Sequence, residues 1–206
     1  MKLLMATTNK HKINEILRIF DEFIPGKMEL LSLEDVLDNM IEVEETGATF
    51  EENAKIKAQT YYKLSQIACF AEDSGLEIDA LDGAPGVFSA RFAGVQGEHP
   101  ENRRKALRLL ENVPLEKRTA RYRAVICYCD QTGTYFFDDS VEGKIGFDER
   151  GTGGFGYDPV FIPDEYLKIP ELSGKTFAEI SAEEKHRISH RGKAVMKLIH
   201  FLRDNN

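Results

Sequence analysis

Four candidate sites along the sequence, one of them made of two segments, contain residue types that bind phosphate, metal ions or flat rings. The first is ATTNKHK, residues 6–12, where an apolar strand leads directly into an amphipathic helix. Backbone N–H groups at such a junction are available to an anion, and the helix dipole favours negative charge there. Hydrogen bonds and positive charge would come from Thr7, Thr8, Asn9, Lys10 and Lys12. The alternative is a polar helix cap with solvated lysines, and the lack of glycine excludes a Walker loop or a dinucleotide fingerprint.

Two acidic segments, IEVEETG (41–47) and AEDSG (71–75), could supply carboxylates to a metal ion. Asp73 follows an apolar strand, so we expect its side chain at a strand end, where α/β proteins place their ligands. Glu44 and Glu45 precede a helix cap. Carboxylates from separate segments that meet at one edge of a sheet suit a hard divalent cation. The alternative for the two glutamates is a solvated loop that favours the following helix N-terminus.

The third segment, ISHRGKA (188–194), opens the last helix of the chain. Its polar side chains, together with a lysine about one turn upstream, could bind an anion or the edge of a base; they are Lys185, Ser189, His190 and Arg191. The alternative is that Ser189 only caps the helix and that Arg191 lies in solvent.

The fourth segment, GTGGFGYDPVF (151–161), places four glycines around aromatic residues. Glycine permits a positive φ and close approach of another backbone or of a flat ligand. Phe155 and Tyr157 alternate in direction if the loop is extended, so one of the two could lie against a flat ligand, with the glycines as clearance. The alternative is a hairpin corner with packed aromatic side chains.

The elements that must position these segments follow from the spacing of apolar residues. Strands are expected at residues 2–7, 28–33, 67–73 and 159–162, and helices at residues 13–20, 49–65, after Pro100 and at the end of the chain. Three capping boxes support the helix starts: Thr49 with Glu52, Thr176 with Glu179, and Ser181 with Glu184.

Residues 119–147 differ from the rest, because two long alternating stretches separated by Gln131-Thr132 predict an antiparallel hairpin. Helices that alternate with strands around such an insert predict an α/β protein with a mixed sheet. We expect one domain over residues 1–206, with two lobes, a cleft between them, and the hairpin in the second lobe.

The composition limits the class of protein. A net charge of −8 over 206 residues argues against broad nucleic-acid binding, although a local cluster of lysine and arginine can still bind one phosphorylated ligand. No apolar run approaches the ~20 residues of a membrane helix, and the apolar start is too short for a signal peptide, so we expect a cytoplasmic protein without membrane contact. The three cysteines, two of them in CYC, are expected to be buried thiols.

The order of the motifs resembles that of the inosine triphosphate pyrophosphatase family, which hydrolyses ITP, dITP and XTP to the monophosphate and pyrophosphate. The similarity runs from residue 3 to about residue 200 and is carried by ATTNKHK, EETGATFEENA, AEDSGLEIDALDGAPGVFSARFAG, GTGGFGYDPVF and EEKHRISHRGKA. It implies an α/β fold with a long central mixed β-sheet, flanking helices, two lobes with a cleft between them, and a homodimer.

The resemblance also implies roles for single residues. The phosphate loop falls on Thr7, Thr8, Asn9, Lys10, His11 and Lys12, and a further substrate contact falls on Ser74. The magnesium ligands fall on Glu44 and Asp73, with Glu45 as the neighbouring candidate, and Asp73 is also the expected proton acceptor. The base-binding residues fall on Phe155, Gly156, Tyr157, Asp158, Lys185, His190 and Arg191.

The chemistry of these residues suits that reaction. Carboxylates 4 Å from a phosphate cost about 4 kcal/mol at an effective dielectric constant near 20, so Mg²⁺ is expected between them. Arg191 and Lys185 can only donate hydrogen bonds. They would therefore bind the 6-keto oxygen of a purine and disfavour adenine, whose 6-amino group is itself a donor. Two alternatives remain: a related nucleotide pyrophosphatase with a different base preference, and a nucleotide sensor without catalysis.

Overall fold

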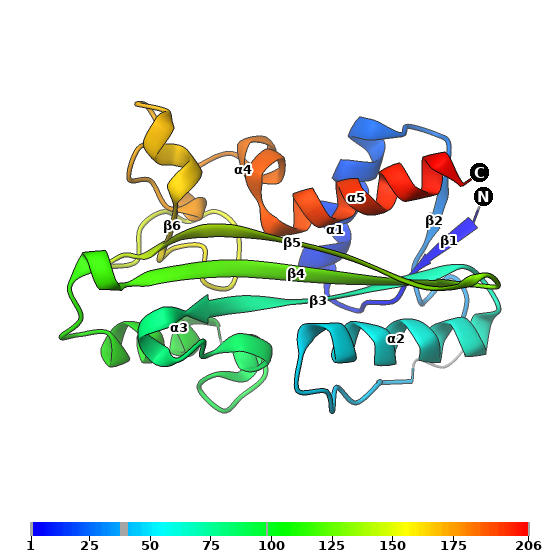
Figure 1. Ribbon diagram of the computed structural model, residues 1–206, viewed down its shortest axis with the longest axis horizontal. Helices are drawn as coiled ribbons and strands as arrows, with labels where there is room; N and C mark the ends of the chain where they lie inside the picture. Colours follow the sequence, from blue (N-terminus) through cyan, green and yellow to red (C-terminus); the bar gives the residue numbers. More distant parts are fainter. Residues whose placement is uncertain (1, 38–40, 98, 206) are drawn as a thin grey trace. The chain divides into compact units, whose positions relative to one another are not determined.

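The computed structural model describes residues 2–37, 41–97 and 99–205. Six strands form one mixed sheet in the order β2-β1-β3-β4-β5-β6 (Figure 1). The chain divides into two compact units. Unit 1 comprises Met1–Asp73, Ala124–Asp139 and Arg191–Asn206, and unit 2 comprises Ser74–Arg123 and Ser140–His190. Strands β3, β4 and β5 contribute residues to both units. The α/β class and the mixed sheet expected from the sequence are confirmed.

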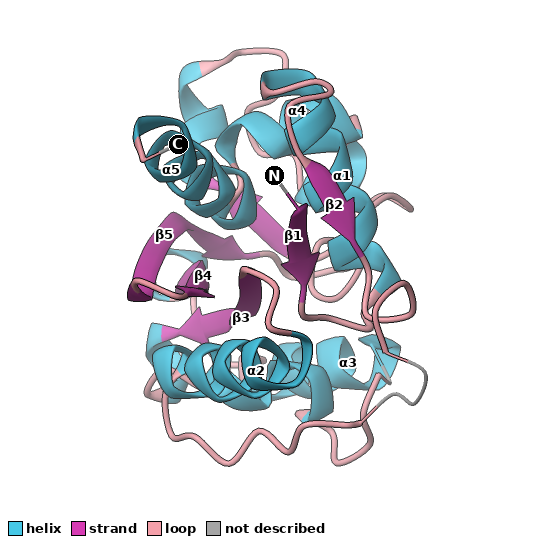
Figure 2. Cartoon of the chain, turned by 90° about the vertical axis from the view of Figure 1, so that its right-hand side faces the viewer, coloured by secondary structure: helices cyan, strands magenta, loops and turns pink. Residues whose placement is uncertain are grey.

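Unit 1 begins with a parallel strand pair and the helix that follows it. Strand β1 (Lys2–Met5) pairs with β2 (Glu29–Leu31) and with β3, so that Leu4 is opposite both Leu31 and Cys69. The helices of this unit are α1 (Lys10–Phe23), α2 (Phe50–Ser65) and α5 (His190–Asp204). Helices α1 and α5 cover one face of these strands and α2 lies against the other (Figure 1, Figure 2).

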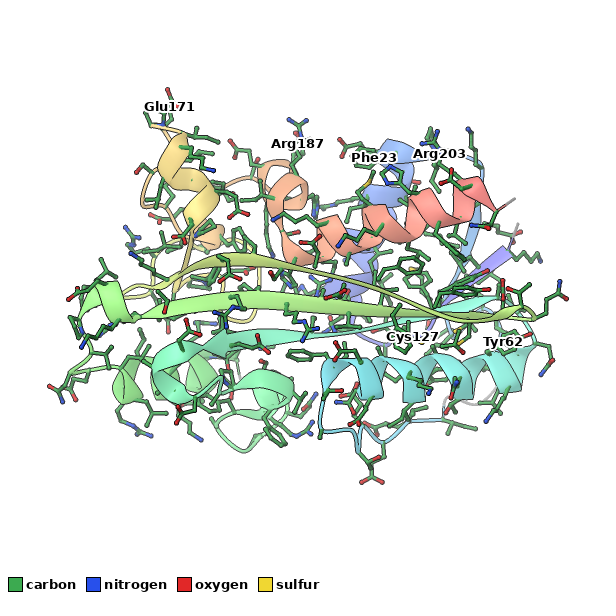
Figure 3. The ribbon with its side chains drawn as sticks, viewed as in Figure 1. Phe23, Tyr62, Cys127, Glu171, Arg187 and Arg203 are labelled. Carbon is green, nitrogen blue, oxygen red and sulfur yellow. The ribbon has the colours of Figure 1, made fainter. Side chains whose placement is uncertain are left out.

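The core of unit 1 confirms the apolar faces expected for its helices. Buried side chains from β1, α1, the start of β3, the hairpin tip and α5 pack together; they include Leu3, Ile16, Phe20, Phe70, Ile126, Val195 and Leu198. The three cysteines are buried thiols on β3 and β4, as expected, and Cys127 is labelled in Figure 3.

Strand β3 (Cys69–Ile78) is longer than expected, which corrects the predicted position of Asp73. The sequence Asp-Ser-Gly indicated a strand end, but the strand continues because Leu76 and Ile78 are fully buried in the core of unit 2. Asp73 therefore lies inside a strand and not at its end. Its flanking residues are consequently held in extended backbone geometry.

The hairpin was predicted closely. Strands β4 (Thr119–Asp130) and β5 (Gly133–Ile145) are separated by Gln131-Thr132, and the Asp130 side chain accepts hydrogen bonds from the next backbone N–H groups. The hairpin is divided between the units, with 124–139 in unit 1 and its remaining residues in unit 2. Strand β6 (Phe161–Pro163) is antiparallel to β5 and begins two residues later than expected.

Unit 2 contains α3 (His99–Leu109), α4 (Ala182–Ile188) and a second core built around Leu76, Ile145, Phe161 and Phe177. Short 3-10 helices connect its elements: η1 (Asp79–Leu81), η2 (Gly86–Arg91), η3 (Leu115–Lys117), η4 (Asp164–Lys168) and η5 (Phe177–Glu179). Both capping boxes predicted for this unit are present, at Thr176 and at Ser181. In α4 the side chains of Lys185 and His186 are buried, whereas Arg187 points outward (Figure 3).

The third predicted capping box forms only in part. Thr49 caps α2 by accepting from the Glu52 backbone N–H, but the Glu52 carboxylate accepts from Ala48 and not from Thr49. Across the described ranges, the structure contains no helix with the length and apolar character needed to span a bilayer.

Candidate functional site

The segment at residues 7–12 is organised by Asn9. The Asn9 side chain caps α1 and accepts hydrogen bonds from the backbone N–H groups of His11 (3.0 Å) and Lys12 (3.2 Å). Thr7 Oγ1 in turn accepts from Asn9 N at 3.2 Å. Two of the N–H groups that the sequence offered to an anion are thus bound within the loop, as in the alternative reading of a polar cap. Thr8, Lys10 and His11 are exposed.

Lys12 is the lysine of this loop that the fold turns inward. Its Nζ lies 3.6 Å from Glu72 Oε1 and 3.5 Å from the Glu72 carbonyl oxygen. Burial lowers the pKa of Lys12, and the Glu72 carboxylate only partly opposes that shift because Lys57 and Arg191 act in the same direction as burial. An additional anion would therefore stabilise the charged form of Lys12.

Asp73 is buried, with 7% of its surface exposed, and is held by two residues of α2. Asn53 Nδ2 donates to Asp73 Oδ2 at 3.1 Å, and Lys57 Nζ lies 3.4 Å from Asp73 Oδ1. The sequence reading missed both α2 residues. Their signal is a spacing of four residues just after the helix cap, which places two polar side chains on one helical face.

The Lys57 ammonium bridges several acceptors. It donates to the Glu72 carbonyl oxygen at 2.9 Å and to the carboxylate of Glu45. Burial lowers the pKa of Lys57, but attraction to Asp73 and Glu45 outweighs this, so the net pKa is raised and the group stays charged. Burial raises the pKa of Asp73, which Lys57 and Lys12 oppose only in part. A carboxylate with a raised pKa is a stronger base.

The two glutamates of the predicted metal site lie in different surroundings. Glu45 is partly buried beside Lys57, whereas the side chain of Glu44 is exposed. In the described ranges, no three side chains of the His, Cys, Asp and Glu types are grouped to hold a metal ion by themselves. Mg²⁺ in nucleotide sites usually takes one or two carboxylates, with water and phosphate oxygens as its other ligands. Asp73 and a neighbouring glutamate fit such a partial set.

Arg191 is fully occupied with acidic side chains of unit 1. Its Nε and one terminal nitrogen lie 2.7 and 2.9 Å from the two Glu72 carboxylate oxygens, and its other terminal nitrogen pairs with Glu15. Only 2% of Arg191 is exposed. Burial opposes its charge, but Glu72 and Glu15 raise the pKa of Arg191 overall. The contacts of Arg191 therefore differ from those of a base-reading donor.

The base-binding residues expected at 155–158 are brought together with Lys185 within unit 2. Lys185 Nζ lies 2.8 Å from Asp158 Oδ2, and both side chains are buried. The same oxygen accepts from Phe155 N at 2.8 Å. Lys185 Nζ also lies 5.0 Å from the centroid of the Phe155 ring, close enough for a cation–π interaction.

Tyr122, on β4, is a second residue that the sequence reading missed. Its hydroxyl donates to Asp158 Oδ1 at 3.3 Å and accepts from Tyr157 N at 3.1 Å. Its ring stacks on His190, with centroids 4.7 Å apart and an interplanar angle of 4°. Tyr122 thereby joins His190 to the 155–158 turn. Nothing in its alternating strand distinguishes it from a core residue.

Two glycines of the 151–161 loop, Gly151 and Gly154, make room for protein atoms and not for a ligand ring. A Cβ on Gly154 would lie 2.0 Å from Asp158 Oδ2, and one on Gly151 would lie 2.3 Å from the Ala178 carbonyl oxygen. Both glycines also have φ values, +68° and +81°, that other residues rarely adopt. A Cβ on Gly156, beside Phe155, would meet nothing closer than 3.8 Å, so clearance for a ring stays a prediction at that position.

The remaining predicted contact, Ser74, is partly buried on β3 as the first residue of unit 2. The structure thus gathers Lys12, Glu45, Asp73 and Arg191 with unit 1, and Phe155–Asp158, Lys185 and His190 with unit 2.

Comparison with known proteins gives consistent matches over nearly the whole chain. The Ham1 family model matches residues 3–201. The chain is 44% identical over 201 residues to the dITP/XTP pyrophosphatase of Porphyromonas gingivalis, covering 98% of this chain and 97% of the relative. The structure of the Staphylococcus aureus Ham1 protein matches with a TM-score of 0.85 and 36% identity, over 100% of both chains. A nucleoside-triphosphatase, or dITP/XTP pyrophosphatase, from Mycobacterium abscessus matches at 39% identity and a TM-score of 0.75, covering 96% of this chain and 98% of the other.

Proposed function

Because the chain belongs to the Ham1 family, we propose that it hydrolyses the non-standard purine nucleoside triphosphates ITP, dITP and XTP to the monophosphate and pyrophosphate. One observation supports this function above the others: the buried carboxylate of Asp73 is held by Asn53 and Lys57. These two contacts hold the carboxylate in one position inside the fold, as a general base requires.

The phosphates bind to residues of unit 1. Lys12 and Lys57 lie beside Glu72 and Asp73, so they supply positive charge where a triphosphate brings negative charge. The proposed substrate contacts are completed by Ser74, the first residue of unit 2, and by the remaining loop residues of unit 1, which are Thr7, Thr8, Asn9, Lys10 and His11. Positioning and charge stabilisation dominate phosphoryl transfer, so no covalent nucleophile is needed.

Asp73 acts as the general base. Its carboxylate, held by Asn53 and Lys57, takes a proton from the water that attacks the α-phosphorus, with pyrophosphate as the leaving group. Such help is typically worth about 10²–10⁴-fold in rate. Asp73→Asn should lower kcat by that factor while the thermal unfolding temperature stays near the wild-type value. A variant that keeps full turnover would rule Asp73 out as the base.

Asp73 and one of Glu44 and Glu45 would hold Mg²⁺. When bound, the ion would neutralise charge on the phosphate oxygens and on the leaving pyrophosphate. Of the two glutamates, the contacts favour Glu45, because it shares the Lys57 ammonium with Asp73. Lys57 keeps these carboxylates compensated in the absence of a metal ion.

The base binds to residues of unit 2. Phe155 stacks on the purine, and Gly156, Tyr157, Asp158 and His190 shape its surroundings. Lys185 donates to the 6-keto oxygen while Asp158 orients it. Arg191 binds Glu72 and Glu15 through all three of its guanidinium nitrogens, so a contact with the base would form beside these ion pairs or in their place. A homodimer and a cytoplasmic location stay predictions.

Pyrophosphate release from ITP, XTP, dITP, GTP and ATP, with and without Mg²⁺, tests this function directly. We expect release from the first three nucleotides, much less from GTP and ATP, and loss of activity on chelation. Nucleotide binding without release would support the sensor alternative. Preferential hydrolysis of GTP, ATP or a pyrimidine nucleotide would replace the proposed base preference.

A further inference from the structure

Helix α3 supplies an arginine to the turn that carries Phe155. Arg103, on α3, donates from one terminal nitrogen to the Gly156 carbonyl oxygen at 2.9 Å. Its other terminal nitrogen lies 2.9 Å from Glu149 Oε2. Only 13% of the Arg103 side chain is exposed. The planar guanidinium thus joins the turn to the segment before the glycine-rich loop.

The contact with Arg103 adds to the other hydrogen bonds that hold the backbone of this turn. Phe155 N is bound by the Asp158 carboxylate, Phe155 O accepts from Asp158 N, and Tyr157 N donates to the hydroxyl of Tyr122. Tyr157 O accepts from the backbone N–H groups of residues 160 and 161. Gly156 O differs in accepting from a charged side chain, that of Arg103.

The same face of α3 also contacts the aromatic ring of the turn. His99 lies four residues before Arg103, so the two side chains project from neighbouring positions on the helix. The His99 and Phe155 rings meet edge to face, with centroids 6.4 Å apart and an interplanar angle of 61°. Helix α3 therefore touches both the ring of Phe155 and the backbone of the next residue.

We propose that Arg103 is a positioning residue for base binding, which fixes the 155–158 turn through Gly156 and thereby orients Phe155. This inference rests on the proposed function, in which Phe155 stacks on the purine. Arginine suits the position because its rigid fork can bind the carbonyl and the Glu149 carboxylate at once. Arg103 is assigned no contact with the nucleotide, so its effect should fall on binding and not on the chemical step.

The test compares Arg103→Gln and Arg103→Lys with Arg104→Gln. Arg104 is the adjacent helix residue, is exposed, and pairs only within α3, with Glu101, among the contacts the structure gives for it. Arg103→Gln should raise KM for ITP about tenfold, as expected for a lost charge-assisted hydrogen bond, with kcat within twofold of wild type. Arg103→Lys should fall between, and Arg104→Gln should match wild type.

Amide hydrogen exchange of the 155–158 turn provides a readout without nucleotide. In Arg103→Gln the Tyr157 and Asp158 amides should exchange about tenfold faster, whereas core amides of β4 should not change. An unchanged KM together with unchanged exchange would overturn the inference, and so would a loss confined to kcat. If Arg103→Gln does not fold, Arg103→Lys decides between the same outcomes. If the wild-type chain releases no pyrophosphate from any nucleotide, the proposed function fails, while the exchange rates still decide the role of Arg103.

Discussion

The side-chain amide of Asn53 joins two separate segments of unit 1: its oxygen accepts from Gly47 N at 2.8 Å, and its nitrogen donates to Asp73 Oδ2 at 3.1 Å. The first bond fixes which end of the amide faces Asp73. Asn53 is 1% exposed, so neither contact competes with much water. The catalytic candidate is therefore oriented by a neutral donor whose own orientation is set by the loop after Glu45.

Asn53→Asp should disrupt this arrangement. A carboxylate at position 53 would face Asp73 without a donor between them, and like charges in a buried site raise the pKa of one or both groups. We expect a loss of about 1–3 kcal/mol in unfolding free energy and a large fall in kcat. Chemical denaturation and pyrophosphate release would measure both. Wild-type turnover in this variant would mean that Asp73 does not need the Asn53 donor.

Lys57→Met should lower kcat/KM for ITP by about 10–100-fold, because the variant removes a charge-assisted donor from Asp73, Glu45 and the Glu72 carbonyl. Lys55→Gln is the matched control, since Lys55 is exposed on the same helix. Steady-state kinetics of the two variants should separate the contribution of this ammonium from a general effect of charge on α2. Equal activities would contradict the assignment of Lys57 to the site.

Arg191→Met should destabilise unit 1 by about 3–5 kcal/mol, because it leaves the buried Glu72 without its bidentate partner. The double variant Arg191→Met/Glu72→Gln should recover part of that loss in a denaturant titration. The ratio of ITP to ATP hydrolysis then tests recognition separately. A ratio that stays at the wild-type value in the folded double variant would confine Arg191 to a structural role.

Gly154→Ala should destabilise the protein more than Gly174→Ala does. Both glycines have positive φ values, +68° and +75°, so both variants carry a backbone cost of about 1–2 kcal/mol. Only at Gly154 would the new Cβ meet the Asp158 carboxylate, whereas the space at Gly174 is open. Thermal unfolding of the two variants isolates this steric effect. Equal unfolding temperatures would show that the carboxylate moves aside at little cost.

Local signals were sufficient for much of the fold. The hairpin turn at Gln131-Thr132 and the capping boxes at Thr176 and Ser181 depend on residues at most a few positions apart, so the sequence pattern specifies them. The continuation of β3 past Asp73 could not be read in this way. It depends on the burial of Leu76 and Ile78 in a core assembled from distant segments.

The candidate site shows the same division. Motifs located Asp73, Lys12, Phe155 and Lys185, but the residues that hold them come from elsewhere in the chain. Asn53 lies 20 residues from Asp73, and Tyr122 lies 36 residues from Asp158. Polar residues in a helix or aromatic residues in an alternating strand are common, so only the fold shows that Asn53 and Tyr122 contact side chains of the candidate site. The roles of Gly151 and Gly154 were misread for the same reason, because the atoms they accommodate belong to Ala178 and Asp158.

The burial of all three thiols gives the protein an internal reporter of its own opening. Cys69 and Cys127 are 0% exposed and Cys129 is 1% exposed, so an aromatic disulfide reagent can reach them only when unit 1 opens. Burial also raises the pKa of Cys69, which lowers its fraction of reactive thiolate. Thiol labelling rates would therefore track the stability of the half of the chain that contains Asp73, without an added probe and without altering any residue proposed to bind the nucleotide.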